Sequence, residues 1–280
     1  MPSDGRALLP ALGSDDVASF VNKHRVRLRH RSTPERGAVE HREPIFNVPG
    51  GVLATLAILI GVHITLSLLT PELREWWILT LAFIPARYAG FASQLPGGDT
   101  AAVTSFVTHM AVHADIVHLG FNAVWLLAFG SVLCARLGNF RFFAFSILGG
   151  ISGALLFLAF NFGLAAPVIG ASGAISAMMG GVMRFLFNAV DHRQGYLLRK
   201  EPRAIPRMSL MQALGDRRVI FFSLVFLGLN LLATIGFGTF GATGAIAWEA
   251  HIGGYVFGLC AFSLFDSATQ NDPPSAAQRD

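Results

Sequence analysis

Two side chains of this chain have the types that nucleophilic catalysis uses, and each lies at the end of an apolar run. Ser172 stands in Gly170-Ala171-Ser172-Gly173, between an uncharged stretch with glycine and proline and a hydrophobic segment. His251 opens another hydrophobic segment as Ala250-His251-Ile252-Gly253-Gly254. A serine hydroxyl activated by an adjacent imidazole is a nucleophile–base pair. Ionisable groups inside a bilayer are costly and usually functional, so the two residues indicate hydrolytic chemistry at membrane depth.

The composition is that of a protein with several membrane-spanning helices. Of the 280 residues, 53% are hydrophobic and 14% are charged, whereas a soluble domain carries about 25% charged residues. A spanning helix needs about 20 mostly apolar residues. Six such runs predict an all-α membrane protein with a six-helix bundle, at about residues 50–69, 110–133, 142–160, 172–187, 219–236 and 250–265.

Lysine and arginine fall almost entirely on one side of these predicted spans. Of the 21 such residues, all but Arg74, Arg87 and Arg184 lie in the two tails or in the connections after the second and fourth spans, and Arg184 lies near the inner end of the fourth span. The positive-inside rule therefore predicts that both termini are cytoplasmic. The same bias accounts for the pI of about 9.6, so we expect no nucleic-acid partner.

The chain divides into a core and two tails. We expect a basic, flexible cytoplasmic tail over residues 1–48, a six-helix domain over 49–266 and a flexible tail over 267–280. Residues 15–31 have an alternative interpretation as a basic amphipathic helix on anionic lipid. The chain opens without an early apolar stretch or an organelle-type transit peptide, which favours a multi-pass protein of a bacterial inner membrane.

The polar ends of three predicted spans are expected to lie at one depth. His118, Ser172 and His251 stand 15 to 19 residues before the first inner charge of their spans, or about 22–28 Å at the helical rise per residue. All three therefore lie near the outer surface. Arg184 falls inside the fourth span and is expected to extend its long stem to the inner interface. The uncharged connection 161–171 must then dip inward and present Ser172 at a helix N-terminus, where free N–H groups favour an oxyanion.

Each of these motifs also has a purely structural interpretation. Gly-Ala-Ser-Gly could serve only to pack membrane helices closely, and His251 could be a structural histidine bonded to a carbonyl. Gly254 and Gly258 follow Ala250 at four-residue spacing, which makes a small-residue stripe. Its expected partner is the fourth span, at Gly173, Ala177, Gly180 and Gly181. Such a contact would hold the imidazole beside the serine.

A third cluster, at the start of the second span, contains His109, His113, His118 and Asn122. His118 and Asn122 are four residues apart and share a helix face, which suits two donors of an oxyanion hole. His113 and His118 are five residues apart, which is poor for joint metal ligation on a helix. We therefore expect no metal and no cofactor, and we expect His109 and His113 to stabilise the loop that enters the span.

These motifs together resemble those of the rhomboid intramembrane serine proteases. The resemblance covers about residues 50–266 and is carried by four stretches in the order that the family has, which are Thr108-His109-Met110-Ala111-Val112-His113, His118-Leu119-Gly120-Phe121-Asn122, Gly170-Ala171-Ser172-Gly173 and Ala250-His251-x-x-Gly254-x-x-x-Gly258. It implies that Ser172 is the nucleophile and His251 the general base. It also implies that His118, Asn122 and the backbone N–H of Ser172 bind the oxyanion.

The chain departs from the family pattern at three places. Thr104-Ser105 replaces a Trp-Arg pair of the first outer loop, and Cys134 replaces an acidic residue near the inner end of the second span. Ser176 replaces the aromatic residue that often packs against the catalytic histidine, four residues after the serine. Ser176 could hydrogen-bond His251 or take no part.

The resemblance implies a serine endopeptidase that cleaves transmembrane segments of other membrane proteins near their outer ends. The expected partners are single-pass or polytopic membrane proteins and the lipid bilayer. A non-catalytic rhomboid-like protein that binds transmembrane helices is the main alternative. A small transporter that uses the irregular segment before Ser172 is the third, although no inverted repeat is visible.

Overall fold

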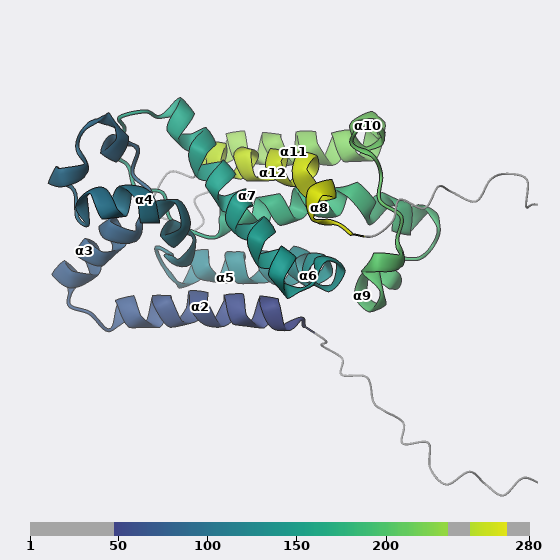
Figure 1. Cartoon of the computed structure of the whole chain (residues 1–280), viewed down its shortest axis with the longest axis horizontal. Helices are drawn as coiled ribbons and strands as arrows, with labels where there is room; N and C mark the ends of the chain where they lie inside the picture. Colours follow the sequence, from purple (N-terminus) through teal and green to yellow (C-terminus); the bar gives the residue numbers. More distant parts are fainter. Residues whose placement is uncertain (1–47, 235–246, 268–280) are drawn as a thin grey trace, which may run out of the picture. The chain divides into compact units, whose positions relative to one another are not determined.

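The computed structural model describes residues 48–234 and 247–267, and all regular elements in these ranges are helices. The long helices are α2 (Gly50–Ser67), α7 (Asn139–Phe160), α8 (Ser172–Asp191), α11 (Arg217–Thr234) and α12 (Trp248–Phe265), together with α5 (Ile116–Trp125), which continues through the π-helical turn η4 (Leu126–Gly130) into α6 (Ser131–Leu137) (Figure 1). The predicted tails lie, but for one residue each, outside the described residues.

Four helical segments in the described part are long and apolar enough to cross a membrane. They are α2, the continuous segment Ile116–Leu137, α7 and α8. The prediction of an all-helical integral membrane protein is confirmed. Helices α11 and α12 occupy the places of the fifth and sixth predicted spans, and the number of six spans and the orientation stay predictions.

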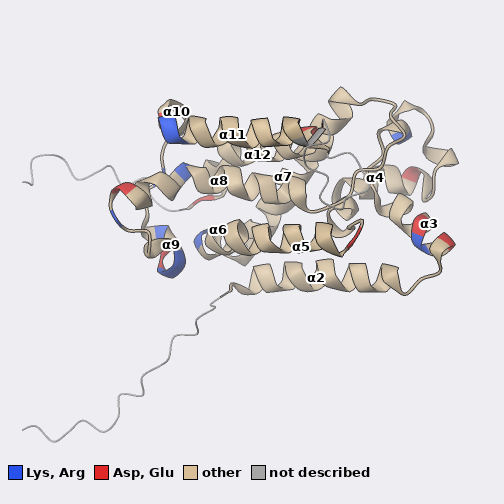
Figure 2. Cartoon of the chain, turned by 180° about the vertical axis from the view of Figure 1, so that it is seen from behind, with Lys and Arg blue, Asp and Glu red and all other residues tan. Residues whose placement is uncertain are grey.

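Shorter helices cap the two ends of the long ones. Near one end lie α3 (Pro71–Leu81), α4 (Gly98–Thr108) and the 3-10 turns η1 (Pro85–Ala89), η2 (Ala92–Gln94) and η3 (His109–Ala111). Near the other lie α9 (Leu197–Lys200), η5 (Pro202–Ala204) and α10 (Leu210–Gly215). Figure 2 shows that most charged residues gather at these ends and that the middle of the helices is nearly free of them, as a hydrocarbon layer requires.

The second span begins at Ile116, so the predicted start at residue 110 is wrong. Asp115 is the N-cap of α5, and its carboxylate accepts a hydrogen bond of 2.8 Å from the N–H of His118. An aspartate in this position satisfies a backbone donor that has no partner within the helix. His109 and Met110 instead belong to the separate turn η3.

Helix α8 forms the centre of the bundle, with α7 and α12 as its closest neighbours. In α8, 78% of the span is buried inside the protein, against 22% in α2. Small residues explain the burial of α8, because they let α12 approach it closely. A Cβ atom on Gly258 would overlap the carbonyl of Ala177, and one on Gly254 would overlap the carbonyl of Gly173. The expected pairing of the glycine stripe with the fourth span is therefore present as a backbone-to-backbone contact.

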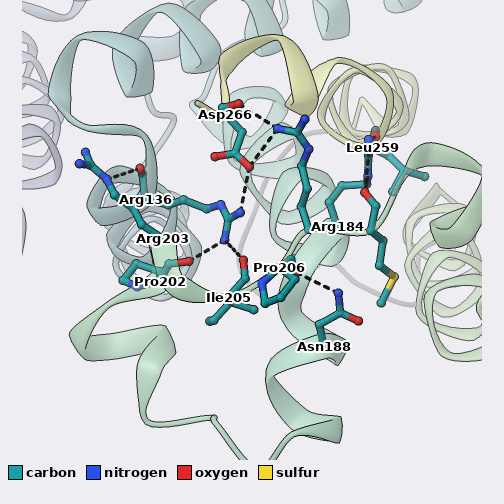
Figure 3. Close-up of polar contacts among 11 residues, drawn as sticks. Arg136, Arg184, Asn188, Pro202, Arg203, Ile205, Pro206, Leu259 and Asp266 are labelled. Atoms are coloured by element: carbon teal, nitrogen blue, oxygen red, sulfur yellow. Dashed lines mark hydrogen bonds and ion pairs between the residues drawn. The ribbon is translucent and has the colours of Figure 1, made fainter. Parts of the chain in front are cut away.

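A cluster of buried arginines ties the helices together at the α9 end (Figure 3). Arg136 of α6 donates to the carbonyls of Pro202 and Ile205 at 2.5 and 2.8 Å, and it pairs with Asp266 at 2.9 Å. Its guanidinium also lies 4.4 Å from the ring centroid of Phe185. One side chain thus joins α6, α8, the connection after α9 and the end of α12.

Arg184 does not extend to the inner interface, so that expectation is wrong. Its side chain is buried, and it donates to the carbonyl of Met208 and, at 2.6 Å, to the carbonyl of Leu259 (Figure 3). These two backbone carbonyls supply the hydrogen bonds that water would have given at the interface.

Replacing Arg136 by methionine should lower the free energy of unfolding by about 3 kcal/mol. The change removes the arginine donor from the carbonyls of Pro202 and Ile205 and leaves Pro202 with only the N–H of Ile205 at 3.4 Å. It also removes one cation from the buried carboxylate of Asp266, and breaking such a pair on one side is strongly destabilising. Thermal unfolding in detergent measures the effect. The control is Arg141→Ala, which removes an exposed arginine and should leave the midpoint unchanged. Equal midpoints for the two variants would contradict the prediction.

Candidate active site

The segment before α8 is held in place by one residue that follows α3 and by one residue of η3. Phe83 and Val168 form an isolated antiparallel bridge with hydrogen bonds of 3.0 and 2.8 Å, and the N–H of Gly170 donates to the carbonyl of His109 at 2.9 Å. Gly170 has φ of +113°, and a Cβ atom there would lie 2.7 Å from Nε2 of His118. Only glycine combines this backbone with so close an imidazole, and α8 then begins at Ser172.

The structure brings Ser172 and His251 into direct contact. Oγ of Ser172, at the first residue of α8, lies 2.7 Å from Nε2 of His251, in the first turn of α12. The glycine contacts between α8 and α12 explain this proximity, because backbones that touch at Gly173 and Gly254 leave a short gap for the two side chains. A hydroxyl and an imidazole at this distance can exchange a proton.

His118, which shares a face of α5 with Asn122, lies beside this pair. A Cβ atom on Gly170 would be 2.7 Å from Nε2 of His118 and 3.8 Å from Oγ of Ser172, so both side chains converge on the same glycine. Asn122 is buried, and its Nδ2 donates to the backbone carbonyl of His118 at 2.9 Å. An amide nitrogen carries two hydrogens, so the second remains for another acceptor.

A protein-family model for the rhomboid domain matches residues 100–266, which is more than half of the chain. The chain belongs to the rhomboid family. No curated protein matches the sequence closely enough to count as a relative. The family is one of intramembrane proteases and includes inactive members, and the matched range contains all the site residues described above.

Two further histidines make contacts near Ser172, one with the preceding helix α4 and one with the residue before the serine. The Nδ1 atom of buried His109 lies 2.7 Å from the carbonyl of Ser105. The Nε2 atom of His113 accepts a hydrogen bond of 3.5 Å from the N–H of Ala171, directly before Ser172. These contacts agree with a stabilising role for both histidines. The expectation named only the loop that enters α5, whereas His113 also contacts the segment that leads into α8.

Sequence reasoning missed one contact of the rhomboid histidine. Nδ1 of His251 lies 2.6 Å from Oδ1 of Asn230 in α11. Ser176, which stands where the family often has an aromatic residue, donates instead to the carbonyl of Ser172 at 2.7 Å. An amide in the middle of an apolar run is itself a signal of function inside a membrane, and it could have drawn attention to Asn230.

The start of α12 carries a buried carboxylate close to the rhomboid site. Glu249 accepts a hydrogen bond of 2.9 Å from Nδ2 of Asn161, which follows α7. This bond ties the first turn of α12 to the end of α7 and so helps to set the height of His251. In the described residues, no three His, Cys, Asp or Glu side chains form a group that could hold a metal ion.

Proposed function

We propose that this rhomboid is an active serine endopeptidase that cleaves transmembrane segments of other membrane proteins. The observation that carries the proposal is the 2.7 Å contact between Oγ of Ser172 and Nε2 of His251. A structural serine at a helix start needs no imidazole partner, and a structural histidine would bond to a carbonyl. The contact of the two side chains is the arrangement that activates a hydroxyl for attack.

The mechanism has two halves that share an acyl-enzyme. His251 accepts the proton of Ser172 as Oγ attacks the scissile carbonyl, and it then donates this proton to the leaving amine. Water, activated by the same imidazole, attacks the ester and releases the new carboxyl end. The backbone N–H of Ser172, at the free N-terminus of α8, and the side chains of His118 and Asn122 receive the developing oxyanion.

The substrate must unwind before it can react. A transmembrane helix has every backbone group hydrogen-bonded, so its carbonyls are not open to attack until a turn is released. Segments with glycine or proline near their outer end need the least free energy for this step. The charge bias supports an orientation with both termini in the cytoplasm and the site on the other side, and we place the enzyme in a bacterial inner membrane.

Replacing Asn122 by alanine should lower kcat by about 10²–10³ and leave KM almost unchanged. The amide donor acts on an oxyanion that exists only in the transition state, so its loss affects turnover and not ground-state binding. Cleavage of a transmembrane reporter in proteoliposomes gives both constants. Asn188→Ala is the matched control, because Asn188 donates to Pro206 at the other end of α8. A change in KM alone for Asn122→Ala would contradict the oxyanion role.

A labelling experiment tests the function itself. The purified protein in detergent is treated with a fluorophosphonate, which forms a covalent bond to an activated serine, and the labelled peptide is identified by mass spectrometry. We expect the label on Ser172 and on no other serine, and we expect the same preparation to cleave a glycine-containing transmembrane segment in proteoliposomes.

The same experiment separates the proposal from its rivals. A rhomboid that only binds transmembrane helices would retain the reporter segment, leave it uncut and show no label on Ser172. A label on a different serine would also overturn the proposed site. Uptake of a solute into protein-containing vesicles that depends on His118 would favour the transporter.

A further inference from the structure

Asn230 of α11 makes a hydrogen bond that the pair of Ser172 and His251 does not account for. Its Oδ1 lies 2.6 Å from Nδ1 of His251, on the side of the imidazole opposite to the serine. The side chain is 8% exposed. Burying an amide in an apolar helix costs free energy unless its polar atoms form hydrogen bonds. The amide oxygen of Asn230 forms its hydrogen bond with His251.

The orientation of the Asn230 amide follows from its own helix. Nδ2 donates to the backbone carbonyl of Phe226 at 2.8 Å, one turn earlier in α11. The opposite orientation would place the amide oxygen against that carbonyl, where two acceptors repel each other. Oδ1 therefore faces His251, and it can only accept.

The acceptor atom Oδ1 of Asn230 fixes which ring nitrogen of His251 carries the hydrogen and which one faces Ser172. Because Oδ1 of Asn230 accepts, Nδ1 of His251 must carry the hydrogen and donate it. In the neutral ring Nε2 is then without a hydrogen, so it accepts from the hydroxyl of Ser172. This is the tautomer that a general base needs, and the other tautomer would present an N–H to the serine and could not take its proton.

Helix α11 is placed for this task by two further contacts with α12. Ser223 and Tyr255 share a hydrogen bond of 2.7 Å between their hydroxyls, and the rings of Phe226 and Tyr255 stack at 5.0 Å. Residues 223, 226 and 230 lie on one face of α11, and residues 251 and 255 lie on one face of α12. The contact of Asn230 with His251 thus belongs to a continuous seam between the helices, which sets its distance.

We propose that Asn230 is a positioning residue that holds His251 in the tautomer and orientation required for attack by Ser172. The proposal rests on the function proposed above. The site then works as a row of serine, imidazole and amide from α8, α12 and α11, in which the amide orients the base but touches neither substrate nor reacting atoms. Its effect on catalysis passes entirely through the ring of His251.

Two substitutions at residue 230 distinguish positioning from packing. Asn230→Leu keeps the size and removes the acceptor, whereas Asn230→Asp keeps an acceptor at the same place. In apolar surroundings leucine is the milder change and aspartate the harsher one. If Asn230 only fills space, Asn230→Leu will be the more active variant. If it positions the base, Asn230→Asp will be the more active.

We expect Asn230→Leu to lower kcat by about tenfold with KM unchanged, since about one hydrogen bond of orientation is lost. Asn230→Asp should recover most of this loss. Gly228→Ala is the matched control, because it changes α11 at a position where a Cβ atom would meet nothing within 4 Å. Its kcat should remain within twofold of the wild type. A fall in kcat for Gly228→Ala as large as that for Asn230→Leu, or higher activity of Asn230→Leu than of Asn230→Asp, would overturn the inference.

A spectroscopic readout separates this inference from the function on which it rests. The ring nitrogens of ¹⁵N-labelled histidine, with His251 assigned by its absence in His251→Gln, report the tautomer in a protein that need not cleave anything. We expect hydrogen on Nδ1 in the wild type and a mixture of tautomers in Asn230→Leu. An unchanged tautomer in that variant would refute the positioning role even in an active enzyme, whereas absent labelling of Ser172 with the expected nitrogen shifts would refute only the proteolytic function.

Discussion

Replacing Ser172 by alanine should reduce peptide-bond cleavage by at least about 10⁴-fold, and His251→Ala should do the same. The first variant removes the attacking oxygen and the second removes its base, and each step is essential to the same acyl-enzyme. Because the two groups act as a unit, the double variant should be no slower than either single one. Turnover of a transmembrane reporter in proteoliposomes measures all three rates.

Ser146→Ala provides the control for this comparison. The hydroxyl of Ser146 donates to the carbonyl of Phe142 in its own helix α7 at 2.6 Å, so its loss changes a serine of the bundle without touching the site. Its activity should match the wild type. Activity of Ser172→Ala within tenfold of that control would show that another group is the nucleophile.

Replacing Gly258 by alanine should destabilise the protein by about 3 kcal/mol and reduce cleavage more than a hundredfold. The added methyl group would overlap the backbone carbonyl of Ala177, and backbone cannot turn aside as a flexible side chain can. Helices α8 and α12 must therefore move apart, which separates Ser172 from His251. Thermal unfolding in detergent and reporter cleavage at a temperature where the variant is folded measure the two effects.

Gly228→Ala is the matched control for the glycine contact. Gly228 lies in α11, and a Cβ atom there would meet nothing within 4 Å. Alanine favours the helix more than glycine does, so the unfolding midpoint should stay level or rise. If Gly258→Ala were tolerated as well as Gly228→Ala, the close approach of α8 and α12 would not be what brings the two side chains together.

The distribution of apolar residues predicted much of the architecture. An all-helical membrane protein follows from runs of about 20 apolar residues. Each residue of such a run adds to the free energy of transfer from water into the bilayer, and this contribution does not depend on which residues pack against it. The glycine stripe of α12 likewise predicted a close helix contact, since four-residue spacing fixes a face of the helix before any partner is known. The start of the second span was misplaced because a single capping group, Asp115, decides it.

The sequence by itself determined that a serine and a histidine lie at helix ends of similar depth, because depth depends only on residues counted along each helix. The tertiary structure alone decided which groups touch them. Asn230 reaches His251 through the seam between α11 and α12, and Arg184 finds carbonyls of Met208 and Leu259 instead of the interface. These contacts join residues far apart in the chain, and the direction of a hydrogen bond depends on which acceptor the fold brings within 3 Å. No local pattern contains that information.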